Sequence, residues 1–354
     1  MNRLSRSLSR GTRMVAVAAG ALLAVTACGS TKGHDAAGTA GSPAQVSIAL
    51  GWTPNTDYTG IYVADSLGYF KKQGISLKVI PYASTAPETL VAHGTADFGF
   101  SYQAGVAYAK AAGHDVIGVF APDQKGTYVI GVRSDRADIA SPKDLDGKTY
   151  AGFGTPDELP ELQSVIRHDG GRGTFNHVTL NTSAYDAVYN GKADFTISVA
   201  TWEVLQSKLV GKPMKSFKLT DYGFPDQYSN LIVSSSKYLT AHADLARRFL
   251  AATQQGYAYA ADHPQEAAKI LIAANPSVFP KPDLVYQSQA ALAAGGYLRN
   301  AKGQVGTQSA SLWSSYGDFL YGNGLLVDGD GKKLAAKPDW STYYTNDYLP
   351  AGSR

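Results

Sequence analysis

The chain has 354 residues, a formal net charge of +3 and a single cysteine, Cys28. One cysteine excludes a disulfide framework, a zinc finger and a cysteine nucleophile in the folded part of the chain. Four of the 32 basic residues lie in the first 27 positions, and without them 28 basic residues face 29 acidic ones. The charge therefore gives no reason to expect a nucleic-acid partner.

Residues 1–27 are predicted to be an export signal. A basic start is followed by an apolar run, Met14–Ala27, which is short for a membrane span. The run ends in LAVTACGS, where small residues precede Cys28 as in a bacterial lipobox, although Val25 stands where Leu is more usual. We expect cleavage before Cys28 and a lipid anchor on its thiol, at the extracytoplasmic face of the cell membrane. The alternatives are an ordinary signal peptide with an incidental cysteine and an uncleaved membrane helix.

Residues 28–43 are small and polar without periodicity, which predicts a flexible tether. About 310 residues follow, enough for two domains. Near the start of this part of the chain, VSIAL (Val46–Leu50) is typical of a strand. The segment DYTGIYVADSLGYFKKQG then predicts a helix, with Thr56 or Asp57 as N-cap and Gly74 just beyond its end.

Strands and helices go on alternating after this helix. SLKVIPY (Ser76–Tyr82) predicts the next strand, and the middle of the chain repeats the pattern. Two similar segments, GTADFGFS (Gly94–Ser101) and GKADFTIS (Gly191–Ser198), each indicate a tight turn followed by a strand. After Ser236 the sequence is strongly helical. The alternation predicts an α/β fold with largely parallel sheets, and the repeated segment fits two similarly built domains, although such turns are common in α/β proteins.

Enzymatic motifs are missing from the sequence. It has no G-x-S-x-G and no P-loop, and GFGTPD (Gly152–Asp157) lacks the third glycine of a dinucleotide fingerprint. No two histidines are spaced as a zinc-binding helix requires. We therefore expect no catalytic residue, no cofactor and no metal site, and a protein that is not an enzyme.

Aromatic residues are abundant, and several follow predicted strands. Ligands of parallel α/β sheets gather outside the carboxyl ends of strands, where aromatic faces can stack on a flat ring. Neighbouring amides and carboxylates could read the edge of that ring. The alternative is that these rings are ordinary core and rim residues. The candidate ligand-binding residues are Trp52, Asn55, Tyr58, Tyr102, Gln103, Phe153, Glu158, Trp202, Glu203 and Tyr222.

The chain resembles the substrate-binding lipoproteins of bacterial ABC importers, in the group related to the yeast thiamine-pyrimidine synthesis proteins (NMT1/THI5-like). The resemblance covers nearly all of residues 46–350. The segments that carry it are WTPNTDYTGIYVADSLGYF, RADIASPKDLDGKTYAGFGTPDE, GKADFTISVATWEVLQSKL, FKLTDYGFPDQYSNLIV, ARRFLAATQQGYAYAADHPQEAAKIL and WSSYGDFLYGNGLL.

The resemblance implies a type II periplasmic-binding-protein fold, in which two α/β domains close on a ligand across a two-strand hinge. It places the hinge near Tyr128–Arg133 and Ser229–Val233, domain 1 at 44–130 plus 233–354, and domain 2 at 131–232. It also implies that Trp52 stacks on the ligand, that Asn55 contacts its edge, and that Trp202 and Glu203 meet the same ring. Closure would present a new surface to the permease.

The implied function is capture of a thiamine-precursor pyrimidine, such as hydroxymethylpyrimidine or formylaminopyrimidine, for an ABC permease and ATPase by a monomer. Riboflavin or a sulfonate is an alternative cargo, although an aromatic and acidic cleft favours a neutral or weakly basic ring. An alternative of another class is a pyrimidine-synthesising enzyme, but Tyr58 stands where those relatives have a histidine, and their Cys-rich motif is missing. A sensor or adhesin that keeps the fold is a further alternative.

Overall fold

The computed structural model describes residues 42–353, so the predicted export signal, Cys28 and most of the tether lie outside the described residues. Residues 43–354 form one compact unit. Within the described range, no helix combines the length and apolarity that a membrane crossing requires.

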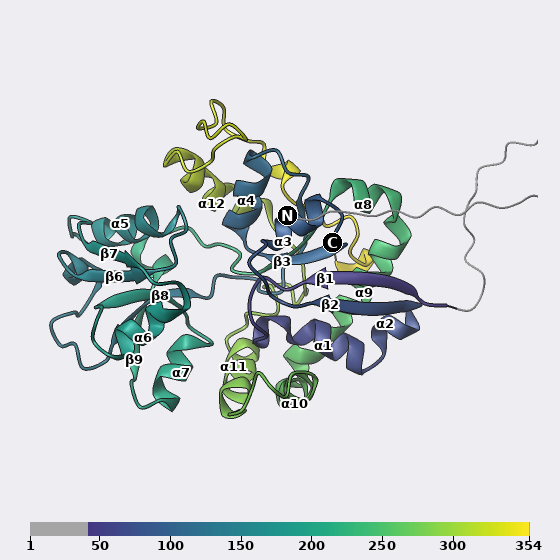
Figure 1. Ribbon diagram of the computed structural model, residues 1–354, viewed down its shortest axis with the longest axis horizontal. Coiled ribbons are helices and arrows are strands. Elements are labelled where there is room, and N and C mark those ends of the chain that lie inside the picture. Colours follow the sequence, from purple (N-terminus) through teal and green to yellow (C-terminus); the bar gives the residue numbers. More distant parts are fainter. Residues whose placement is uncertain (1–41, 354) are drawn as a thin grey trace, which may run out of the picture. The chain divides into compact units, whose positions relative to one another are not determined.

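The first of two sheets has the strand order β2-β1-β3-β10-β4 (Figure 1). β1 pairs in parallel with β2 and β3, whereas β10 runs antiparallel to both β3 and β4. The strands are β1 (Ala44–Ala49), β2 (Ile75–Ile80), β3 (Phe98–Ser101), β4 (Ile117–Phe120) and β10 (Leu231–Ser234). The carboxyl ends of β1, β2 and β3 therefore lie at the same edge of this sheet.

The second sheet has the order β7-β6-β8-β5-β9, with β6 parallel to β7 and β8, and β5 antiparallel to its neighbours. Its strands are β5 (Tyr128–Arg133), β6 (Thr149–Gly152), β7 (Asn176–Thr179), β8 (Phe195–Val199) and β9 (Met214–Lys218). The predicted alternation of strands and helices is confirmed. Among the described strands, each sheet has one that runs antiparallel to the rest, β10 in the first and β5 in the second.

The chain crosses between the sheets twice, at residues 121–127 and at residues 223–230. Of the hinge segments expected from the resemblance, Tyr128–Arg133 forms strand β5, which begins where the first crossing ends, and Ser229–Val233 begins in the second crossing and continues into β10. The two crossings are joined by hydrogen bonds: Thr127 N donates to Ser229 Oγ at 2.7 Å, and Gly126 N donates to Asp226 Oδ1 at 2.8 Å. The division into domains at 130/131 and 232/233 remains a prediction.

The repeated sequence segment forms the same structure in both sheets. Gly94 and Gly191 take positive φ angles of 70° and 69° in the turns that precede β3 and β8. The aspartate after each turn accepts a backbone hydrogen bond from the neighbouring parallel strand, Asp97 from Ser47 N at 2.7 Å and Asp194 from Thr149 N at 2.8 Å. The local similarity of GTADF and GKADF thus reflects an equivalent connection in each sheet.

Helices cover both faces of each sheet. On the first sheet, α1 (Thr59–Ser66), α2 (Tyr69–Lys72) and α9 (Ala243–Asp262) share a buried apolar core with β1 and β3. A second core joins α3 (Pro87–Ala92), α4 (Gln103–Ala111) and α12 (Ala310–Gly322) to α5 (Glu158–His168) of the second sheet. A third packs α6 (Ala184–Tyr189) and α7 (Glu203–Leu209) on the other face of the second sheet. The remaining helices are α8 (Ser236–Ala241), α10 (Pro264–Ala274) and α11 (Asp283–Ala294).

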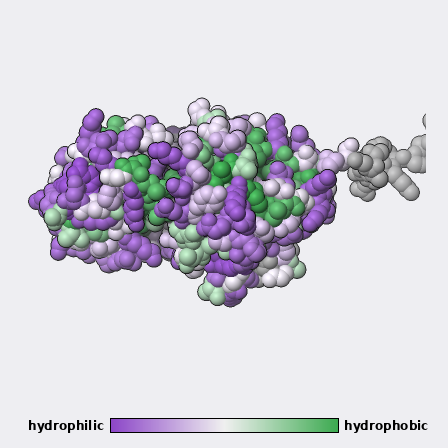
Figure 2. All heavy atoms as spheres, turned by 90° about the horizontal axis from the view of Figure 1, so that it is seen from below, coloured by the Kyte–Doolittle hydropathy of each residue, from purple (hydrophilic) through white to green (hydrophobic). Residues whose placement is uncertain are grey.

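The face of the molecule seen in Figure 2 is mainly hydrophilic, with apolar residues gathered in smaller groups. The large apolar side chains that are exposed elsewhere in the described range are few and scattered. The buried apolar side chains are concentrated in the three cores, which hold the strand ends in place around the cavity described next.

Candidate functional site

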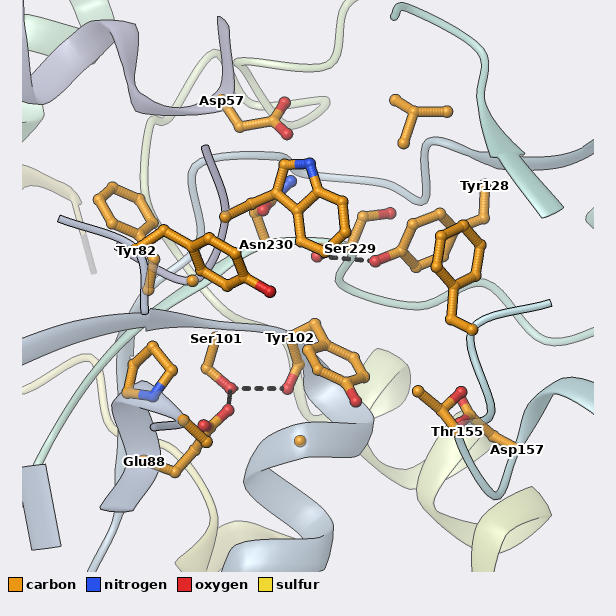
Figure 3. A pocket seen from close by; sticks show the side chains of 18 of the residues that line it. Asp57, Tyr82, Glu88, Ser101, Tyr102, Tyr128, Thr155, Asp157, Ser229 and Asn230 are labelled. Carbon is orange, nitrogen blue, oxygen red and sulfur yellow. Dashed lines mark hydrogen bonds between the residues drawn. The ribbon is translucent and has the colours of Figure 1, made fainter. Parts of the chain in front are cut away.

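A cavity of about 700 Å³ lies between the two sheets, at the carboxyl ends of β1, β2, β3, β6 and β8 (Figure 3). Its floor includes Tyr128, Ser229 and Asn230, which belong to or adjoin the two crossings. The volume is within the usual range for small-molecule sites. The position outside strand carboxyl ends is the one where α/β proteins bind ligands.

Aromatic side chains from both sheets line this cavity. The Trp52 ring lies 5.3 Å from the Tyr82 ring and 6.4 Å from the Phe153 ring, and Phe153 lies 5.5 Å from Tyr185. Tyr58 is buried and lies 4.4 Å from Phe100, so only part of it faces the cavity. Ring faces in these positions can sandwich a flat ligand.

Asp57 and Asn230 lie together on one side of the cavity (Figure 3). Burial raises the pKa of Asp57 to about 6, and a hydrogen bond from Asn230 acts in the opposite direction. Asn230 Nδ2 also donates to Asp123 Oδ2 at 2.9 Å, and burial together with the charge of Asp57 raises the pKa of Asp123 well above its usual range. Within residues 42–353, Asp123 Oδ1 has no hydrogen-bond partner. Asp57 lines the cavity whereas Asp123 does not, so this side of the cavity offers the Asp57 carboxyl group as an acceptor to a ligand that donates hydrogen bonds.

Trp202 and Glu203 lie at the start of α7, directly after β8, and both line the cavity. Trp202 packs on Phe279, with ring centroids 6.3 Å apart. Glu203 Oε2 accepts a hydrogen bond from Val199 N at 2.9 Å. Burial raises the pKa of Glu203 to about 7, and the charge of Asp57 adds to the rise.

The loop before α5 resembles an anion-binding nest, but a side chain of the protein fills it. The backbone N–H groups of Phe153, Gly154 and Thr155 all donate to the Glu158 carboxylate, at 3.0–3.2 Å. Tyr150 donates a further hydrogen bond from its hydroxyl at 3.0 Å. Because these donors are already engaged by a carboxylate, the loop does not present them to an anionic ligand.

The structure brings most of the predicted site residues together. Those that line the cavity are Trp52, Asn55, Tyr58, Tyr102, Phe153, Glu158, Trp202 and Glu203. Asn55 also caps the 3-10 turn η1 (Thr56–Tyr58), because its Oδ1 accepts a hydrogen bond from Asp57 N at 2.9 Å. The predicted caps Thr56 and Asp57 are therefore wrong by one or two residues. Whether any of these residues binds a ligand remains a prediction.

Gln103 and Tyr222 lie outside the cavity. Gln103 is buried, and its amide donates to Leu312 O at 3.0 Å and accepts from Tyr228 N at 3.0 Å, so it ties α12 to a crossing. Tyr222 lies in the 3-10 turn η4 (Leu219–Tyr222) and packs on Phe217 at 6.3 Å. Both residues lie close to the end of a predicted strand. That position shows where the strand ends, but it does not show which way the side chains point.

Sequence reasoning missed several lining residues. Asp57 lies between the predicted site residues Asn55 and Tyr58, so its position and its charge could have identified it. Asn230 lies within the expected hinge segment Ser229–Val233. Glu88, Tyr108 and Glu161 lie within helices, where nothing in the local sequence separates them from surface positions. The missed lining residues that carry polar groups include Asp57, Glu88, Ser101, Tyr108, Tyr128, Asp157, Glu161, Tyr185, Ser198, Ser229 and Asn230.

Solved structures with a similar fold include periplasmic binding proteins. The alkanesulfonate-binding protein SsuA from Xanthomonas axonopodis pv. citri, bound to MOPS, matches 88 % of this chain and 99 % of its own, with a TM-score of 0.61 and 16 % identity. At this identity the likeness shows the fold alone. Together with the two mixed sheets, it defines a type II periplasmic-binding-protein fold, as expected.

The particular family follows from the sequence comparison. The family model described as NMT1/THI5 like matches residues 55–267, and the chain belongs to this family. The formylaminopyrimidine-binding protein of Halalkalibacterium halodurans is 26 % identical over 78 % of this chain and 84 % of its own length. The riboflavin-binding protein RibY of Chloroflexus aurantiacus is 26 % identical over 94 % and 96 %. A 4-amino-5-hydroxymethyl-2-methylpyrimidine phosphate synthase of Legionella pneumophila is 27 % identical over 66 % and 75 %.

Proposed function

We propose that this protein is the extracytoplasmic solute-binding component of an ABC importer and that it captures a thiamine-precursor pyrimidine. The observation that carries the proposal is the cavity itself, which combines aromatic faces with buried carboxyl groups. Among the described residues, no Lys or Arg lines it. A flat ring with amino groups fits such a surface, because the rings stack on its faces and the carboxylates accept its N–H donors.

The same observation argues against an anionic cargo. A sulfonate or nitrate needs donors that are free to bind it, commonly at helix N-termini. Here three of the helices that start at the cavity carry acidic residues in their first turns, Glu88 on α3, Glu158 on α5 and Glu203 on α7. Glu158 fills the nest before α5, and Glu203 bonds the loop before α7. The likeness in fold to a sulfonate-binding protein therefore does not extend to the chemistry of the site.

Synthesis of the pyrimidine is the candidate of another class, since the family contains a synthase. The family resemblance links that activity to pyridoxal phosphate, whose phosphate group also needs free donors. The loop that could cradle a phosphate is bonded to Glu158, and Tyr58 stands in place of the family's histidine. These features favour capture over synthesis.

Riboflavin is the alternative cargo that specific observations support. A riboflavin-binding relative matches nearly the full length of the chain, and a cavity of about 700 Å³ is large for a single pyrimidine ring. Calorimetric titration of the protein without residues 1–28 with hydroxymethylpyrimidine, formylaminopyrimidine and riboflavin separates these possibilities. We expect tight one-to-one binding of a pyrimidine. Binding of riboflavin alone would replace the cargo, and binding of none of the three would contradict the proposal.

A further inference from the structure

One end of the cavity is rich in acidic side chains. We call it the acidic chamber, and its residues are Glu88, Ser101, Tyr102, Tyr108, Asp157 and Glu161. In Figure 3, Glu88 and Ser101 lie on one side of this end and Thr155 and Asp157 on the other, opposite Asp57. The chamber thus lies between the start of α4 on the first sheet and the start of α5 on the second.

The absence of a side chain at Gly105 lets three residues of the chamber pack closely on α4. A Cβ atom at Gly105 would lie 2.6 Å from Glu88 Oε1, 2.9 Å from Tyr102 Cε1 and 3.0 Å from Ser101 Oγ. The carboxyl group, the aromatic ring and the hydroxyl therefore converge on the surface of α4 at a point where any larger residue would displace them. The convergence makes this end of the cavity a built pocket rather than a gap between side chains.

The carboxyl groups of the chamber have few partners. Asp157 is 7 % exposed, and its Oδ2 accepts a hydrogen bond from the Tyr316 hydroxyl at 2.9 Å. Its other oxygen, Oδ1, is buried and makes no hydrogen bond of good geometry in the part of the chain that the structure describes, although the Tyr108 hydroxyl, which also lacks such a bond, interacts with this carboxyl group. Glu161 has only a long contact, 3.4 Å, with Gln227 Nε2. Glu88 accepts from the Ser101 hydroxyl.

Like charges gathered in this way are unfavourable without a cation. Burial raises the pKa of Glu88, and burial together with the charges of Asp157 and Glu158 raises the pKa of Glu161 well above its usual range. A cation bound among these groups would favour their ionised forms. No group of His, Cys, Asp or Glu in residues 42–353 has the geometry to hold a metal ion, so a metal is not the expected cation.

We propose that the acidic chamber binds a cationic amino group on the ligand, so that the preferred cargo is an aminoalkyl-substituted heteroaromatic rather than its hydroxyalkyl analogue. This inference rests on the proposed function. An ammonium group supplies three donors to the oxygens of Asp157, Glu161 and Glu88, and its charge balances theirs. A hydroxyl supplies one donor and no charge.

The first test compares two ligands with the same ring. Hydroxymethylpyrimidine and its aminomethyl analogue, which is an ammonium at neutral pH, are titrated into the protein without residues 1–28 by calorimetry. We expect the aminomethyl compound to bind at least ten-fold more tightly. Equal or weaker binding of the amine, while the alcohol binds, would overturn this inference and leave the proposed function intact. Binding of neither compound would overturn both.

The second test assigns the preference to the chamber. Asp157→Asn keeps the acceptor for Tyr316 and removes the charge, and Glu161→Gln does the same at the neighbouring position. We expect each variant to reduce the preference for the amine over the alcohol to about three-fold or less. The matched control is Glu266→Gln on the exposed surface of α10, which should leave the preference unchanged. Thermal melting checks that each variant is folded, and an unchanged preference in both folded chamber variants would contradict the proposal.

Discussion

At the scale of single residues, the cavity depends on side chains that face inward from loops at strand ends. Trp52 and Trp202 come from different sheets and both line the cavity. Their large faces contribute both apolar area and shape, which is why aromatic residues dominate the binding free energy of many sites.

Trp202 gives a direct test of the ring site. Trp202→Ala should weaken ligand binding by about 1–3 kcal/mol, because it removes a ring face from the cavity wall. Trp202→Phe should recover part of the loss, since a smaller ring remains. Calorimetry measures both variants, with circular dichroism to show that the fold is kept. Unchanged affinity in Trp202→Ala would remove this residue from the site.

Glu203 makes the stability of the protein depend on pH. Its pKa in the folded state is about 7, against an ordinary value of 4.5. Between these values the folded state holds a proton that the unfolded state has lost, so the free energy of unfolding falls as pH rises from 4.5 to 7. The pKa difference corresponds to roughly 3 kcal/mol for a fully buried group.

Replacing this group should remove its share of the pH dependence. Urea unfolding of Glu203→Gln at pH 5 and pH 7.5 should show a smaller fall in stability than the parent protein shows, by roughly 2 kcal/mol. Glu266→Gln is again the surface control. An identical fall in the parent and in Glu203→Gln would mean that Glu203 is not the group responsible.

At the scale of elements, the packing of α1 against α9 relies on two glycines. A Cβ atom at Gly256 of α9 would lie 2.0 Å from the carbonyl oxygen of Gly60 on α1 and 2.9 Å from Ala64 Cβ. The helices can approach this closely only because neither residue has a side chain. α1 in turn follows the loop that carries Trp52 and Asp57, so this contact positions one wall of the cavity.

Gly256→Ala should therefore destabilise the protein by about 1–3 kcal/mol, as overpacking of a tight interface does. Gly322→Ala, at the end of α12, has no atom within 4 Å of the added carbon and should be neutral or slightly stabilising. Chemical unfolding of the two variants measures the difference. Equal stability of the two variants would show that α1 and α9 separate without cost.

Element types were predictable, whereas their caps and connections were less so. Val46–Leu50 and Ser76–Tyr82 correspond to β1 and β2, and Gly74 takes a positive φ of 67° just past the end of α2, as expected. The N-cap shifted to Asn55 because its side chain reaches Asp57 N. Hydrophobic periodicity marks the body of an element, but a cap depends on one side-chain rotamer.

At the scale of the whole molecule, Cys28 is the predicted site of lipid attachment, and it lies outside the described residues. We propose that lipidation of this thiol holds the protein at the extracytoplasmic face of the membrane. Cys28→Ser should move the protein from the membrane fraction to the soluble fraction, which cell fractionation and immunoblotting can measure. Retention in the membrane fraction would instead support the uncleaved helix.

The sequence by itself determined the fold class, the family and the aromatic, acidic character of the loops at the strand ends. These properties are local, because strand and helix periodicity and motif spacing depend on residues that are close together in the sequence. Only the tertiary structure decided which side chains share a cavity. It turned Gln103 toward α12 and placed Tyr222 on Phe217. In the folded protein, Glu158 accepts the hydrogen bonds of the nest before α5, and Glu88, Asp157 and Glu161, which come from two sheets, line the same cavity. The direction of a side chain depends on contacts between distant segments, and such contacts exist only after the chain has folded.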